Sequence, residues 1–128
     1  MSVFVPGDHG STFGGNPLAS VIALAAMAEM EAEDYAARSA AKGAGLLAGL
    51  KSLPHPSIEE VRGRGLLVGI EVRDGVDTKA LGQAFLDERV LTKETRSRTF
   101  RYAPPLIIDD AQIDEVVART SRALDAVS

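Results

Sequence analysis

Hydrophobic residues follow helical spacing in four stretches of the chain. The first runs from Pro17 to Ala28, is interrupted only by Ser20 and is apolar on nearly every side, so it predicts a buried helix. Acidic residues between positions 29 and 34 mark its exit to solvent. Further helices are predicted over residues 34–50, from residue 77 or 78 through 85, and over 110–126.

Residues suited to helix ends stand at the borders of these stretches. Asn16 is a good N-cap and is followed by Pro17, which suits the first helical position because its missing N–H would be unpaired there. Asp77 or Thr78 can cap the third helix. Asp109 with Gln112 three residues later resembles a capping box for the last one.

Alternation replaces helical spacing in the middle of the chain. It predicts a strand over residues 66–73 whose inward residues are Leu66, Val68, Ile70 and Val72. Other strands are predicted over 58–62, 90–92 and 99–102, and Arg62 and Arg64 beside Gly63 are interpreted as a turn with exposed charges. The order of elements predicts an α+β fold, in which helices cover one face of a small, mainly antiparallel sheet.

Composition narrows the class of protein. The chain has 128 residues, 45% hydrophobic and 25% charged, as in an ordinary soluble globular domain. It has no cysteine, which excludes disulfides, Cys-based zinc sites and thiol nucleophiles. A net charge of −4 gives no case for binding nucleic acid or anionic membranes. The apolar run is shorter than the roughly 20 residues that cross a bilayer, and no signal peptide is evident, so we expect a cytoplasmic protein.

Two places in the chain carry candidate chemistry. Between Gly10 and Pro17, the hydroxyls of Ser11 and Thr12, exposed N–H groups and a helix N-terminus suit a phosphate or carboxylate. The competing interpretation is a flexible glycine turn. Arg101 on a short strand could bind a carboxylate through two hydrogen bonds, although most strand arginines are solvated or pair with surface carboxylates. The acidic residues between 29 and 34 do not favour a metal site.

Four segments resemble a known family. Residues 6–19 resemble the His-Gly-Ser-Thr-Phe/Tyr-Gly-Gly-Asn-Pro-Leu signature of class III, fold type I pyridoxal-phosphate aminotransferases, and residues 61–71 resemble the strand that begins the family's C-terminal small domain. Both segments fit ornithine and acetylornithine aminotransferases. Residues 91–95 and 100–108 are similar to the Lys-Glu-Thr-His and Arg-x-Ala-Pro-Pro-Leu-Val-Ile patterns of the ornithine enzymes.

The resemblance implies a C-terminal fragment of a longer enzyme. Residues 1–52 would end the large domain and residues 53–128 would form the small domain. The family's Schiff-base lysine lies upstream of the glycine-rich signature, so it would not be among Lys42, Lys51, Lys79 and Lys93. The expected partners are therefore an N-terminal large-domain chain and a second subunit, with amino acids and 2-oxo acids as substrates. A non-catalytic interaction module and a split-gene remnant are the alternatives.

Residue roles follow from the same resemblance. Thr12, with Ser11 beside it, matches the threonine that reaches the cofactor phosphate of the neighbouring active site. Arg101 matches the arginine that holds the α-carboxylate of glutamate or 2-oxoglutarate. Arg89 replaces the family's usual glycine, which puts a positive-φ turn in doubt, and Arg96 replaces its histidine.

Overall fold

The computed structural model describes residues 10–96 and 98–127, which form two compact units. The first unit is Met1–Asp34 and holds helix α1 (Pro17–Ala32). The second unit is Tyr35–Ser128 and holds all the remaining elements.

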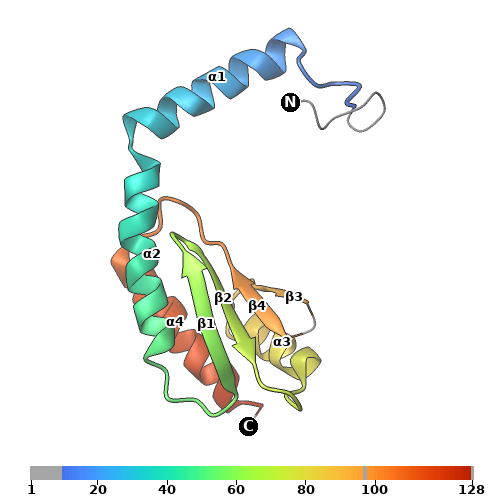
Figure 1. The fold of residues 1–128 in the computed structure, drawn as a ribbon, viewed down its shortest axis with the longest axis vertical. Helices are drawn as coiled ribbons and strands as arrows, with labels where there is room; N and C mark the ends of the chain where they lie inside the picture. Colours follow the sequence, from blue (N-terminus) through green and yellow to red (C-terminus); the bar gives the residue numbers. More distant parts are fainter. Residues whose placement is uncertain (1–9, 97, 128) are drawn as a thin grey trace, which may run out of the picture. The chain divides into compact units, whose positions relative to one another are not determined.

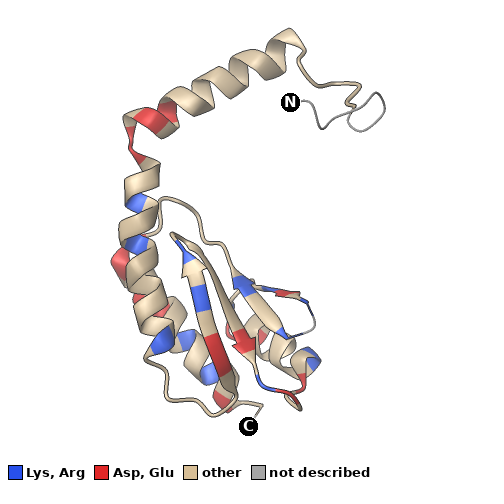
Figure 2. Cartoon of the chain, viewed as in Figure 1, with Lys and Arg blue, Asp and Glu red and all other residues tan. Residues whose placement is uncertain are grey.

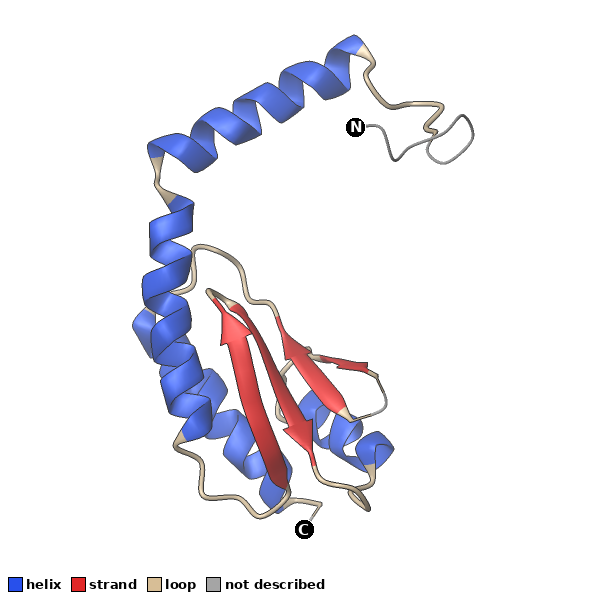
Figure 3. Ribbon diagram, in the orientation of Figure 1, coloured by secondary structure: helices blue, strands red, loops and turns tan. Residues whose placement is uncertain are grey.

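The second unit is a four-stranded antiparallel sheet with three helices (Figures 1 and 3). The strand order is β1 (Ile58–Arg64), β2 (Leu67–Val72), β4 (Thr99–Tyr102) and β3 (Lys93–Thr95). The helices are α2 (Tyr35–Lys51), α3 (Thr78–Asp87) and α4 (Asp110–Asp125). This arrangement confirms the predicted α+β fold with a small, mainly antiparallel sheet.

Alternation along the strands builds the core on one face of the sheet. Val68, Ile70 and Val72 of β2 are buried, as the sequence predicted, and Phe100 and Tyr102 of β4 lie beside them. The ring of Phe85 from α3 lies 5.2 Å from that of Phe100 and 6.2 Å from that of Tyr102, measured between centroids. The helices complete the core with Leu46, Leu50, Leu81, Ile113 and Leu124.

A buried polar pair lies within this core. The hydroxyls of Tyr102 and Thr120 are 3.1 Å apart, and both side chains are buried. Burial raises the pKa of Tyr102 well above its usual value, because the charged phenolate would lose its hydration. The hydroxyl therefore stays protonated and ties β4 to α4.

Helix α2 belongs to the compact second unit because its small residues meet the turn between β1 and β2. A Cβ atom on Gly43 would lie 2.0 Å from the carbonyl of Gly65, so no larger residue fits there. The Leu66 N–H also donates to Ser39 Oγ at 3.1 Å. The compact unit thus begins at Tyr35. The boundary between large and small domain expected between residues 52 and 53 stays a prediction.

The helix caps agree with the sequence. The Asn16 side chain accepts a hydrogen bond from Ala19 N–H, Asp77 caps α3, and Asp109 with Gln112 forms the capping box of α4.

The expected burial of the first helix is wrong for this chain. No residue of α1 is buried, because nothing else within residues 10–34 packs against it, and its exposed apolar side chains are Leu18, Val21, Ile22, Leu24, Met27 and Met30.

Two strand predictions need correction. The strand expected over residues 90–92 is found at Lys93–Thr95, because Val90 is buried at the end of α3 and cannot pair at the sheet edge. Strand β1 extends to Arg64, so Arg62 and Arg64 are exposed strand residues rather than turn residues. The turn itself is made at Gly65, where φ is +55°.

Arg89 keeps the left-handed conformation that its replacement of glycine had put in doubt. Its φ is +59°, and two hydrogen bonds close the end of α3, from Arg89 N–H to Leu86 O and from Val90 N–H to Phe85 O. This pattern is a Schellman motif, in which the residue after the cap usually is glycine. The burial of Val90 and Phe85 holds the arginine in this conformation.

We expect Arg89→Gly to stabilise the second unit by about 1 kcal/mol, because glycine adopts positive φ without steric cost. Urea unfolding of the full chain measures the effect. Ala118→Gly, at an exposed position within α4, is the control and should destabilise by a similar amount. A lower midpoint for Arg89→Gly would show that the arginine side chain contributes more than its backbone strain costs.

Candidate functional site

The glycine-rich loop before α1 is ordered by its own side chains. The Gly14 N–H donates to Ser11 Oγ at 2.8 Å, and a Cβ atom on Gly14 would lie 2.9 Å from Ser11 Cβ. Asn16 donates from Nδ2 to the Phe13 carbonyl at 2.6 Å while its Oδ1 accepts from Ala19 N–H. Gly15 has a φ of +74°. The loop is therefore a defined turn, not only a flexible linker.

Ser11 and Thr12 differ within this loop. The Ser11 hydroxyl is used internally, as the acceptor for Gly14. Thr12 is exposed, and its hydroxyl has no hydrogen-bond partner among residues 10–96 and 98–127. Of the two, Thr12 is the hydroxyl available to an external anion such as a phosphate. Residues 6–9 of the same motif, which include His9, lie outside the described part of the chain.

Arg101 lies on β4, in the second unit. Its neighbours Phe100 and Tyr102 are buried, so its own side chain projects from the opposite, open face of the sheet. In register it faces Gly69 of β2 and Lys93 of β3. The Thr92 hydroxyl donates to the Arg101 carbonyl at 2.9 Å and fixes the backbone there.

Other arginines around the sheet already have acidic partners. Arg62 lies 2.6 Å from a Glu71 oxygen, and Arg98 contacts the same carboxylate at 3.2 Å and that of Glu59 at 2.8 Å. Hydrogen bonds to Glu71 and then Glu60 raise the pKa of Arg62, and a hydrogen bond to Glu59 raises that of Arg98. By contrast, no described residue forms an ion pair with Arg101. Arg101 is thus exposed to solvent, as expected for most strand arginines, but it does not pair with a surface carboxylate of the described residues.

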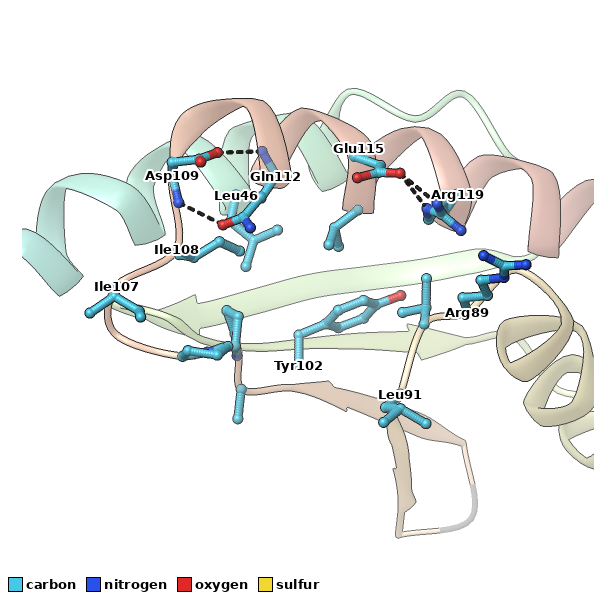
Figure 4. A pocket seen from close by; sticks show the side chains of 15 residues that line it. Leu46, Arg89, Leu91, Tyr102, Ile107, Ile108, Asp109, Gln112, Glu115 and Arg119 are labelled. Carbon is cyan, nitrogen blue, oxygen red and sulfur yellow. Dashed lines mark hydrogen bonds and ion pairs between the residues drawn. The ribbon is translucent and has the colours of Figure 1, made fainter.

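A cleft of about 660 Å³ opens elsewhere in the second unit, between α4 and the loops that follow α3 and β4 (Figure 4). Figure 4 shows Tyr102 between the two ends of this cleft, with Arg89 and Arg119 at one end and Ile107 and Asp109 at the other. Arg119 is paired with Glu115, and Asp109 is used in the capping box. None of Ser11, Thr12 and Arg101 lines the cleft.

No sequence motif predicts this cleft, because its walls come from residues that are distant in the chain. Among the described residues, no three His, Asp or Glu side chains gather as a metal site would require. Nor does that part of the chain contain a helix with the length and apolar character needed to cross a membrane.

The family is decided by the match of almost the whole chain to one family profile. Residues 1–124 match the profile described as Aminotransferase class-III. The chain belongs to the class III aminotransferases. The resemblance seen in its glycine-rich and strand motifs is thereby confirmed.

Curated relatives of this class III chain include the ornithine aminotransferase of Staphylococcus carnosus, which is 43% identical over 122 residues. That alignment covers 95% of this chain but 30% of the relative. An ornithine aminotransferase 1 of Staphylococcus aureus is 44% identical and is covered to 29%. The chain therefore spans about 30% of the length of these relatives.

Similar solved structures are also about three times longer than this chain. The crystal structure of ornithine aminotransferase from Toxoplasma gondii has a TM-score of 0.84 and 38% identity, with 98% of this chain and 31% of that chain covered. The acetylornithine aminotransferase of Elizabethkingia anophelis has a TM-score of 0.82 and 35% identity, with 96% and 33% covered. The class III chain thus corresponds to a segment of that fold.

Proposed function

We propose that this chain forms the C-terminal part of an ornithine δ-aminotransferase, in which a large domain and a second subunit complete the active site. The complete enzyme would transfer the δ-amino group of ornithine to 2-oxoglutarate, giving glutamate semialdehyde and glutamate. The names of the relatives and the motifs at residues 91–95 and 100–108 support this substrate. The observation that carries the proposal is Arg101 within the second of these motifs, which is exposed and forms no ion pair with any described residue.

The residues of the glycine-rich loop fit pyridoxal phosphate. A Toxoplasma gondii ornithine aminotransferase structure is described as having partial occupancy of that cofactor at its active site. In this chain, the open Thr12 hydroxyl can donate to a phosphate, with Ser11 holding the loop in shape. When bound, the cofactor supplies an electron sink for the amino acid's reacting carbon. The lysine that carries it would come from the large domain.

Arg101 would bind and orient the acceptor. Its guanidinium is planar, and it can hold a carboxylate through two parallel hydrogen bonds. Because it projects from a paired strand whose backbone is fixed by Thr92, the substrate would be held by a rigid element. Ornithine's α-carboxylate lies far from its reacting nitrogen, so we infer that large-domain groups hold it.

The exposed apolar side chains of α1 support the need for partners. Contiguous apolar surface of this kind marks sites of protein contact. In the complete assembly, the large domain and the second subunit would cover it. The same feature fits the alternative of a non-catalytic interaction module, which would use α1 for binding alone. An acetylornithine aminotransferase fragment is a second alternative, favoured by the likeness to the Elizabethkingia anophelis structure.

Reconstitution tests the proposal. The purified chain alone should not transaminate ornithine with 2-oxoglutarate, and borohydride should not fix pyridoxal phosphate to one specific lysine of it. Co-production with a large-domain chain that carries the cofactor lysine should restore activity, measured as glutamate semialdehyde. A preference of the complex for acetylornithine would favour the alternative enzyme. A stable complex without activity would favour the interaction module.

A further inference from the structure

Two basic side chains face each other across the outer edge of the sheet. Lys93 of β3 and Arg101 of β4 are partners in the antiparallel register, so both side chains project from the same face. Directly opposed residues have Cβ atoms about 4.5–5.5 Å apart, and like charges at such positions destabilise a sheet. Both residues are exposed. The fold therefore places two positive charges side by side, which lowers the local stability of the sheet.

No acidic group in the described part of the chain offsets this pair. Arg62 is neutralised by Glu60 and Glu71, on the β1 side of the sheet. Neither Lys93 nor Arg101 forms an ion pair with any residue in the described ranges. Figure 2 shows red and blue segments together on β1, whereas β4 carries blue ones. The red segment on β3 includes Glu94, which pairs with the buried Phe100 and so projects from the opposite face to Lys93 and Arg101. Among the described residues, positive charge is left unpaired on this face of the β3–β4 edge.

The other flank of Arg101 is free of a competing side chain. Its partner on β2 is Gly69, which carries none. Across that glycine lies Arg62, whose guanidinium is held by its own acidic partners. An anion at Arg101 would thus meet Lys93 as the nearest unpaired cation along this row of the sheet.

We propose that Lys93 is the second cation of the carboxylate-binding site around Arg101, and that it gives the site a preference for doubly charged 2-oxo acids over singly charged ones. The inference rests on the proposed role of Arg101 in carboxylate binding. Arg101 supplies the two-point grip, while Lys93 is a mobile point charge that adds attraction in proportion to the ligand's charge. A dianion also relieves the repulsion between the two side chains.

Binding of two matched acids to the isotopically labelled full chain tests this role. 2-Oxoglutarate and 2-oxopentanoate have the same number of carbons, but only the first has a second carboxylate. Backbone NMR titrations at constant ionic strength would give both dissociation constants from the resonances of β3 and β4. We expect Lys93→Gln to weaken 2-oxoglutarate binding about fivefold, which corresponds to about 1 kcal/mol. Binding of 2-oxopentanoate should change less than about twofold, because a single charge gains less from Lys93.

Two further variants separate charge from structure. Lys93→Arg keeps the charge and should retain the preference for 2-oxoglutarate. Lys79→Gln, which removes a lysine of α3, controls for the change in net charge and should leave both constants unaltered.

Arg101→Gln separates this inference from the proposed function. If it leaves both constants unchanged, Arg101 does not bind carboxylates and the proposed function loses its support. If Arg101→Gln weakens both acids but Lys93→Gln weakens neither, or both equally, the role of Lys93 is overturned while that of Arg101 stands. Absence of any shift in β3 and β4 with either acid would overturn the role of Lys93, whereas that of Arg101 is decided separately by the kinetics of Arg101→Lys in the reconstituted enzyme.

Discussion

In the reconstituted enzyme, Arg101→Lys should raise the KM for 2-oxoglutarate about tenfold or more while leaving retention of pyridoxal phosphate unchanged. Hydrogen bonds to charged groups contribute about 1.5–3 kcal/mol each, and an ammonium cannot reproduce the planar two-point grip of a guanidinium. Arg101 is suited to this role because no described acidic side chain competes for it. The loss should appear in the half-reaction that consumes 2-oxoglutarate.

Single-turnover kinetics of the two half-reactions measure this separation. The ornithine half-reaction should be slowed much less, because its α-carboxylate is expected to lie with large-domain groups. Arg64→Lys is a matched control, since Arg64 is also an exposed arginine on a strand of the same sheet. Equal losses in both half-reactions for Arg101→Lys would contradict a role in binding the acceptor.

Local signals explain why most of the second unit could be predicted. The alternation in residues 66–73 identified the buried face of β2, and the caps at Asp77 and Asp109 fixed the starts of α3 and α4. Each of these signals involves neighbours in sequence, so no tertiary information is needed. The strand at residues 90–92 failed because Val90 is apolar for a tertiary reason, its burial against the end of α3.

Helix α1 shows what such local signals cannot predict. Its apolar residues indicate burial, yet a hydrophobic pattern does not say what covers it. Within residues 10–34 nothing does. The sequence also did not predict the close contact of Gly43 with Gly65, because this contact joins two segments that are distant in the chain.

The sequence predicted which residues belong to the candidate site, but it did not predict the contacts that surround each of them. The motif pointed to Ser11 and Thr12 together, whereas the structure separates a hydroxyl that shapes the loop from one that is open. Likewise, the sequence left Arg101 between a ligand-binding and a surface-paired arginine. The register that sets it opposite Gly69 and Lys93, away from the glutamates, is a property of the assembled sheet.

The open hydroxyl of Thr12, unlike that of Ser11, is free to bind the cofactor phosphate. In the reconstituted enzyme, Thr12→Ala should weaken retention of pyridoxal phosphate about tenfold or more, because it removes a hydrogen bond to a charged phosphate worth about 1.5–3 kcal/mol. Equilibrium dialysis of the cofactor measures the change. Thr12→Ser keeps a hydroxyl at the same position and should restore most of the affinity.

Ser11→Ala provides the comparison that locates the effect. It removes the acceptor of the Gly14 N–H, so it should loosen the loop rather than delete a phosphate contact. Loosening would lower cofactor affinity less than Thr12→Ala does, because the open hydroxyl of Thr12 remains available. If Thr12→Ala left cofactor affinity unchanged while Ser11→Ala reduced it, the phosphate would be bound by the shape of the loop and its backbone N–H groups. Thr12 would then have no direct part in holding the cofactor.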